Sequence, residues 1–157
     1  MALEPDRHED PFHQDISFYM DEVAERGGIA VLLTAGSGGG WKTPMGDTNN
    51  VVTYAADPVG KKPMGILMND MVAVNEVTGY TRMYGQRDEM PVGAKCRLLR
   101  KGWVTTNRIL GTPVGGEAAY VAASGYITPT AASGLAQLGS FMGSKNEFGY
   151  ARVAVDV

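Results

Sequence analysis

A glycine-rich stretch near the N-terminus has the residue types of a phosphate-binding loop. Residues 36–43 read GSGGGWKT and follow an apolar run, as the G-x-x-x-x-G-K-T pattern of nucleotide-binding proteins does. Trp41, however, stands where that pattern has its second glycine, and Pro44 and Gly46 interrupt the helix whose amides would bind phosphate. We therefore interpret this stretch as a linker and expect no nucleotide or other cofactor.

Histidine and cysteine are too few and too dispersed for a metal centre or a nucleophilic mechanism. The histidines are His8 and His13, whereas a zinc site needs three or four converging ligands. Cys96 is the only cysteine, and its neighbours Lys95 and Arg97 could lower its pKa. Because these three residues alternate along an expected strand, the thiol should face the core. We predict no metal site and no catalytic residues.

A basic run with a tryptophan inside it is the one concentration of side chains that could bind a polyanion. Basic residues interleaved with an aromatic ring can hold single-stranded nucleic acid, but a net charge of −3 opposes that interpretation. We favour an exposed strand face or edge protected by charges, with an acidic surface of another protein as the alternative partner. The residues of this run are Lys95, Arg97, Arg100, Lys101, Trp103 and Arg108.

Length and composition limit the elements that position these residues. A chain of 157 residues is typical of one domain, and 44% of the residues are hydrophobic, enough for one sizeable core. The 21 glycines and 8 prolines together make 18% of the 157 residues, whereas an average protein has roughly 12%. This excess predicts many turns between short strands. The apolar runs, such as 29–33, are far shorter than the ~18 residues of a membrane helix. We expect a soluble protein without an export signal or a membrane partner.

The first 26 residues differ from the rest in charge and in periodicity. They contain eight acidic and two basic residues, whereas the remainder carries a net positive charge. Residues 1–15 should form an extended arm, anchored by Leu3 and Phe12. From residue 16, apolar residues recur with the spacing of a helix, which predicts an amphipathic helix of about three turns that must dock to be stable. Its apolar stripe consists of Ile16, Tyr19, Met20 and Val23.

After Gly28 the pattern becomes that of short strands separated by turn residues. The alternation is clearest at the C-terminus, where Val153, Val155 and Val157 share one face. The predicted fold is all-β, a barrel or sandwich-like fold, with a short N-terminal helix and an extended arm. We divide the chain into an acidic arm with its helix (1–27), a strand with a glycine-rich linker (28–46) and a β-barrel domain (47–157). The expected strands are 29–33, 51–54, 65–74, 80–84, 94–99, 103–109, 118–123, 126–128, 136–142 and 150–157.

Three segments after Gly46 form a recognisable pattern of turns and strands: KPMGILMND (62–70), RKGWVTTN (100–107), and LGSFM (138–142) leading into GYARV (149–153). With these segments the chain resembles the capsid decoration, or cement, proteins of tailed bacteriophages, and this resemblance implies a fold of the β-tulip type. It implies a non-enzymatic protein on the outside of the expanded virion capsid, assembled in the bacterial cytoplasm. It also implies a homo-oligomer, with a trimer favoured and a dimer possible, that bridges and stabilises major capsid protein subunits.

Three further expectations concern what the protein binds and through which residues. The alternative function is a β-sheet module that binds glycans or a host surface through Trp41, Trp103 and Tyr126. Direct nucleic-acid binding is not expected. The residues that we predict to contact the capsid or a neighbouring subunit are Leu3, Phe12, Ile16, Tyr19, Met20, Val23, Arg97, Arg100, Lys101 and Trp103.

Overall fold

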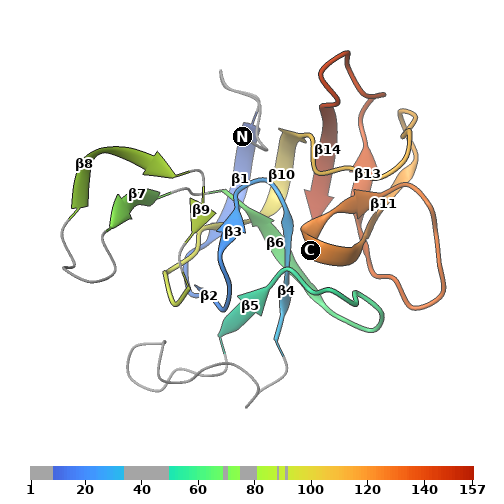
Figure 1. The fold of residues 1–157 in the computed structure, drawn as a ribbon. Helices are drawn as coiled ribbons and strands as arrows, with labels where there is room; N and C mark the ends of the chain where they lie inside the picture. Colours follow the sequence, from blue (N-terminus) through green and yellow to red (C-terminus); the bar gives the residue numbers. More distant parts are fainter. Residues whose placement is uncertain (1–8, 34–49, 69–70, 75–80, 88, 91) are drawn as a thin grey trace.

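The regular elements of the described residues are almost all short β-strands (Figure 1). The computed structural model describes residues 9–33, 50–68, 71–74, 81–87, 89–90 and 92–157. Within these ranges no α-helix occurs, and the one helical element is a 3-10 turn, η2 (Ala123–Gly125). The strands are β1 (Glu9–Asp15), β2 (Tyr19–Met20), β3 (Ala24–Glu25), β4 (Ile29–Leu32), β5 (Val51–Thr53), β6 (Pro63–Leu67), β7 (Met71–Val74), β8 (Thr81–Arg87), β9 (Glu89–Met90), β10 (Leu98–Thr106), β11 (Ala118–Val121), β12 (Ile127–Thr128), β13 (Gln137–Phe141) and β14 (Ala151–Asp156).

One mixed sheet contains ten of these strands. Its order is β12-β11-β13-β14-β10-β6-β4-β5-β2, and β1 pairs with β10 outside this path. All neighbours are antiparallel except β2 and β5, which are parallel. Among the described strands, β12 and β2 are the two ends of an open path. Two small sheets, β3 with β9 and β7 with β8, complete the described strands.

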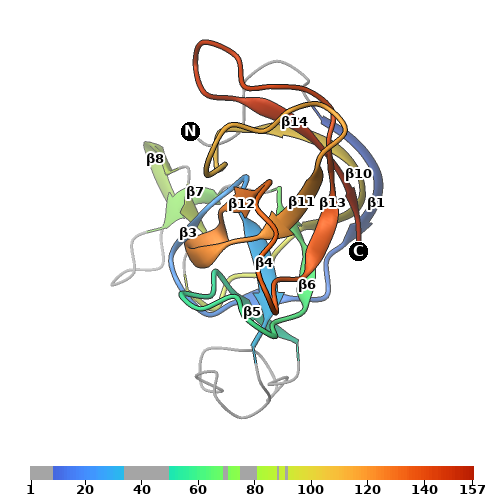
Figure 2. The ribbon, with the colours of Figure 1, turned by 90° about the vertical axis from the view of Figure 1, so that its right-hand side faces the viewer.

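Strand β10 lies in the middle of this path and pairs with three strands, β14, β6 and β1. At Leu98 it pairs with β6 on one edge and with Asp15 of β1 on the other. At Lys101 it pairs with Asp156 of β14 and again with β1. Strand β1 therefore covers one edge of β10, while β6 and β14 share the opposite edge. Figure 2 shows β1 running along the outer side of β10.

The central strands separate two hydrophobic clusters. On β4, Ile29 and Val31 belong to one cluster, and Ala30 between them belongs to the other. On β10, the neighbouring residues Leu99 and Leu98 are divided in the same way. Successive side chains of a strand point to opposite faces, so these strands are buried on both sides. The expectation of a buried strand from residue 29 is confirmed, with its end at Leu32.

The C-terminal strand also follows its predicted alternation. Val153 and Val155 of β14 are buried, whereas Arg152 and Asp156 are exposed. Val157, directly after the strand, is partly buried and packs against the core. The alternation therefore defines two different surfaces of β14, an inner face of buried valines and an outer face that carries Arg152, Ala154 and Asp156.

The predicted amphipathic helix over residues 16–23 is wrong. Phe18 and Met20 are buried, while Ile16 and Val23 are 59% and 54% exposed. Tyr19, also part of the predicted stripe, has an intermediate exposure. These exposures do not form one helical stripe, and the residues belong instead to β2 and to the loops on either side of it.

Backbone pairing with distant segments explains why the helix does not form. The N–H groups of Met20 and Asp21 donate to the carbonyls of Ala94 and Val52 at 3.0 Å each. These bonds satisfy groups that a helix would have satisfied locally. Because a helix of about three turns is marginal on its own, pairing with the sheet can replace it.

All three segments predicted from the sequence contribute strands to the main sheet. Strands β1 and β2 come from residues 1–27, β4 from 28–46, and the others from 47–157. Residues 9–15 of the predicted arm are extended, but they also form a regular strand, β1, paired with β10, although the prolines of the arm argue against regular structure. The glycine-rich stretch 36–43 and Leu3 lie outside the described residues. In the ranges that the structure describes, no helix has the length and apolar character needed to cross a membrane.

Candidate functional site

The described residues contain no cluster that could perform catalysis with a metal. Within these ranges, no three histidine, cysteine or acidic side chains converge to hold an ion. Cys96 is buried, and desolvation raises the pKa of its thiol to about 12. A thiol in that state is a poor nucleophile, because the thiolate is the reactive form. The candidate site considered next is a hollow on the surface of the main sheet.

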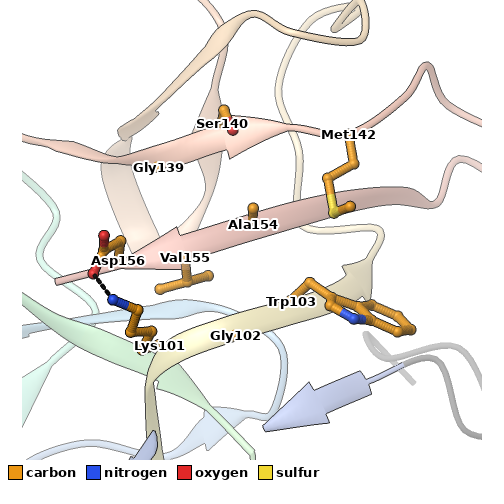
Figure 3. A pocket seen from close by; sticks show the side chains of 9 residues that line it. All are labelled: Lys101, Gly102, Trp103, Gly139, Ser140, Met142, Ala154, Val155 and Asp156. Carbon is orange, nitrogen blue, oxygen red and sulfur yellow. Dashed lines mark ion pairs between the residues drawn. The ribbon is translucent and has the colours of Figure 1, made fainter. Parts of the chain in front are cut away.

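An apolar trough lies on the outer face of β10, β14 and β13 (Figure 3). Its volume is about 510 Å³. The three strands are neighbours in the sheet, so the trough crosses them rather than following a loop. It is lined by Lys101, Gly102 and Trp103 of β10, by Gly139, Ser140 and Met142 at β13, and by Ala154, Val155 and Asp156 of β14.

Small residues in register form the floor of the trough. Trp103 pairs with Ala154, which in turn pairs with Ser140, so a large side chain stands beside two small ones. Gly139 permits the close approach of β13 and β14, because a Cβ atom there would lie 1.9 Å from the carbonyl oxygen of Ala154. The hollow thus results from short side chains between longer ones at Trp103 and Met142.

The rim of the trough is charged. The guanidinium carbon of Arg152 lies 4.2 Å from the centroid of the Trp103 ring, which is a cation–π arrangement. At the other end, Lys101 and Asp156 form an ion pair of 3.7 Å. Both of these side chains are mostly exposed, so the pair contributes little to stability. An apolar floor with a polar rim is the usual anatomy of a protein-binding surface.

Strand β1 neutralises part of the predicted basic run. The carboxylate of Asp15 lies 3.8 Å from the guanidinium of Arg100. Hydrogen bonds donated by the Ser17 hydroxyl and amide lower the pKa of Asp15; partial burial opposes this and Arg100 assists it. The Asp15 side chain is thus an anion at neutral pH, held beside a basic residue of β10.

The basic run is not one continuous patch. Arg100 and Lys101 are paired with acidic groups of β1 and β14. Arg108 forms a salt bridge of 3.0 Å with Glu25 and lies 5.4 Å from the centroid of the Tyr126 ring, apart from the trough. Arg97 is partly buried. Of the four residues of this run predicted as contacts, Lys101 and Trp103 line the trough.

The N-terminal residues predicted as contacts do not form a single surface. Ile16 and Val23 are exposed, Tyr19 is partly buried, and Met20 is buried in the core. Phe12 belongs to β1, at an irregular position in its pairing with β10. Met20 is therefore a core residue in this structure and cannot contact a partner without local unfolding.

Several residues of the trough were missed from the sequence. Ala154 and Asp156 line the trough, and Arg152 contacts the Trp103 ring next to it. All three lie between or next to the buried valines of β14. Their outward orientation follows directly from that alternation, which was therefore a usable signal. No local sequence pattern identifies Ser140 or Met142 as trough residues, because their position in the trough depends on the register of β13 against β14.

Comparison with known proteins identifies the family. No curated protein matches the chain. The family described as structural cement protein (E217 gp24/Pam3 gp6) matches residues 11–156, which include the trough and all but the first two residues of β1. Its members are phage proteins of a structural, non-enzymatic class. The chain therefore belongs to the phage structural cement protein family.

Proposed function

We propose that this protein binds the outer surface of the expanded phage capsid and bridges neighbouring major capsid protein subunits. Membership of the cement family supports a capsid-stabilising role in the virion. The trough on β10, β14 and β13 is the observation that carries the assignment of a contact surface. If capsid subunits bind this surface on many copies of the protein, the copies would link those subunits by non-covalent contacts alone.

The side chains of the trough suit a contact with another protein. Tryptophan is enriched among the residues that dominate binding energy, and the Trp103 ring lies against the Arg152 guanidinium. The floor at Ala154 and Ser140 leaves room for a protruding side chain of the partner. We assign the capsid contact to this face, with Lys101 and Asp156 on its polar rim.

The proposed assembly is a homotrimer, with a dimer as the alternative. Several weak contacts in one oligomer gain avidity, because binding of one subunit raises the effective concentration of the others at the lattice. In this proposal the sheet belongs to a barrel or sandwich-like fold of the β-tulip type, formed in the bacterial cytoplasm. Light scattering distinguishes the two states, since each subunit contributes 16.7 kDa.

The N-terminal segment supplies the proposed contacts between subunits. Ile16 and Val23 are exposed and available for such contacts, and Tyr19 is partly so. We also assign Leu3 and Phe12 to these contacts between subunits. Met20 is excluded from them because its side chain is in the core.

A variant that fills the trough tests the proposed capsid contact. Ala154→Arg would place a long charged side chain on the apolar floor, and we expect weaker co-sedimentation with expanded heads assembled without this protein. Ala131→Arg is the matched control, because Ala131 is exposed and does not line the trough. Equal binding of the two variants and the unaltered protein would remove the trough from the interface. Failure of the unaltered protein to bind heads would contradict the proposed function itself.

The alternative of a glycan-binding module depends on free aromatic faces. Trp103 and Tyr126 each have an arginine against the ring, at 4.2 Å and 5.4 Å respectively. Trp41 lies outside the described residues. Titration with oligosaccharides should therefore leave the tryptophan fluorescence unchanged, whereas a saturable change would favour the glycan-binding function.

A further inference from the structure

A second apolar surface lies at the end of the sheet next to the trough. Thr106 of β10 pairs with Ala151 of β14, and Phe141 of β13 pairs with Val153, so the loops that follow β10 and β13 meet at this end. Figure 1 shows the β13–β14 hairpin extending beyond the strands there. Four large apolar side chains on these loops are exposed: Leu110, Val114, Met142 and Phe148.

Hydrogen bonds join the two loops, so the positions of their exposed side chains are fixed relative to one another. The N–H of Gly116 donates to the carbonyl of Phe141, and the N–H of Phe141 donates to the carbonyl of Glu117, each at 2.8 Å. The ammonium of Lys145 donates to the carbonyl of Ile109, also at 2.8 Å. The hairpin therefore has a fixed position relative to the loop that follows β10.

The turn that carries Phe148 is closed by its own hydrogen bonds. The Asn146 side-chain oxygen accepts from the N–H of Phe148 at 3.0 Å and from the N–H of Tyr150 at 2.9 Å. The N–H of Asn146 donates to the carbonyl of Tyr150, and Gly149 takes the left-handed conformation (φ 82°) that the turn requires. Phe148 is nevertheless 72% exposed, so nothing in the described chain covers its ring.

We infer that the β13–β14 hairpin is an anchor that inserts Phe148 into an apolar pocket of the major capsid protein. This inference rests on the proposed function and adds a second, separate contact to it. The hairpin is continuous with the trough, because Met142 lines the trough and also begins the hairpin. A capsid protein seated on the trough would thus meet the hairpin next.

The rigidity of the turn supports the role of an anchor. Binding through a flexible loop loses affinity because the loop must be ordered, and a closed turn avoids most of that loss. A single exposed aromatic residue is unremarkable, but here four large apolar side chains are exposed on two connected loops, and partners commonly cover such concentrations of apolar surface. The polar side chain of Asn146 is used to hold the turn, which leaves Phe148 as the group presented outward.

Truncation of Phe148 tests the inference. Phe148→Ala should weaken binding to expanded heads lacking this protein by at least about tenfold, as removal of an anchoring aromatic residue does. Phe148→Leu should retain part of the affinity, because it keeps a large apolar group. Val59→Ala is the matched control, since Val59 is 54% exposed on the loop between β5 and β6. All variants should unfold at the same temperature as the unaltered protein.

The outcomes separate the anchor from the proposed function. If Phe148→Ala binds heads as tightly as Val59→Ala does, the anchor is wrong and capsid binding through the trough stands. If Phe148→Ala changes the mass in light scattering without heads present, the pocket belongs to a second copy and the inference is overturned. If the unaltered protein does not bind heads, the proposed function fails, and the anchor fails with it.

Discussion

The guanidinium of Arg108 lies 3.0 Å from the carboxylate of Glu25, although the two residues are 83 positions apart in the chain. The same guanidinium lies 5.4 Å from the ring centroids of both Tyr54 and Tyr126. The Tyr54 hydroxyl in turn donates to the carbonyl of Glu25 at 2.6 Å. This group of contacts joins the N-terminal segment to the rest of the protein.

Removal of Arg108 should therefore destabilise the protein. Arg108→Ala loses an ion pair and two ring contacts at a mostly buried position, and we expect the free energy of unfolding to fall by about 1–3 kcal/mol. Urea denaturation measures this change. Arg152→Ala is the control, because it also loses a ring contact but at an exposed position. A double-mutant cycle with Glu25→Gln would show no coupling if the salt bridge were unimportant.

The stability of the protein should depend on the ionisation of Asp15. The folded state lowers the pKa of this carboxyl below its ordinary value of about 3.8, so its contribution is present at neutral pH and is lost as the pH falls below that value. Asp15→Asn should be less stable by about 0.5–1 kcal/mol at pH 7 and should converge with the unaltered protein in acid. Denaturation at a series of pH values tests this. Asp156→Asn, which alters a more exposed ion pair, should show a smaller difference at pH 7.

The Cys96 thiol should be unreactive in the native protein. Burial raises its pKa to about 12, so almost no thiolate is present at pH 8. We expect negligible labelling by iodoacetamide under native conditions and complete labelling in urea, measured by mass spectrometry. Rapid native labelling would show that the second hydrophobic cluster, to which Cys96 belongs, opens readily.

Truncation of Met20 should destabilise the protein much more than truncation of Ile16. Met20→Ala creates a cavity in the core and should lower the free energy of unfolding by about 2–5 kcal/mol. Ile16→Ala removes an exposed side chain and should change it by less than about 0.5 kcal/mol. Thermal or urea unfolding of the two variants measures both effects. Equal destabilisation would contradict the strand arrangement of residues 16–23 and favour a packed helical stripe.

The resemblance to cement proteins and the β character of the chain were available from the sequence. Alternation at Val153 and Val155 and the apolar run from Ile29 predicted buried strands, because such patterns depend only on which face of a strand is covered. The same alternation could have identified Arg152 and Ala154 as outward residues. Trp103 and Lys101 were predicted as contacts, and the structure places both at the trough.

Tertiary structure decided the conformation of the N-terminal segment and the composition of the trough. Ile16 and Met20 have helical spacing, yet hydrogen bonds from Met20 to Ala94 and pairing of β2 with β5 give this segment partners that its own sequence does not reveal. The trough likewise requires Trp103, Ala154 and Ser140 to be in register on three strands. Periodicity reports only local burial, whereas strand pairing over long distances along the chain is set by the packing of the whole sheet.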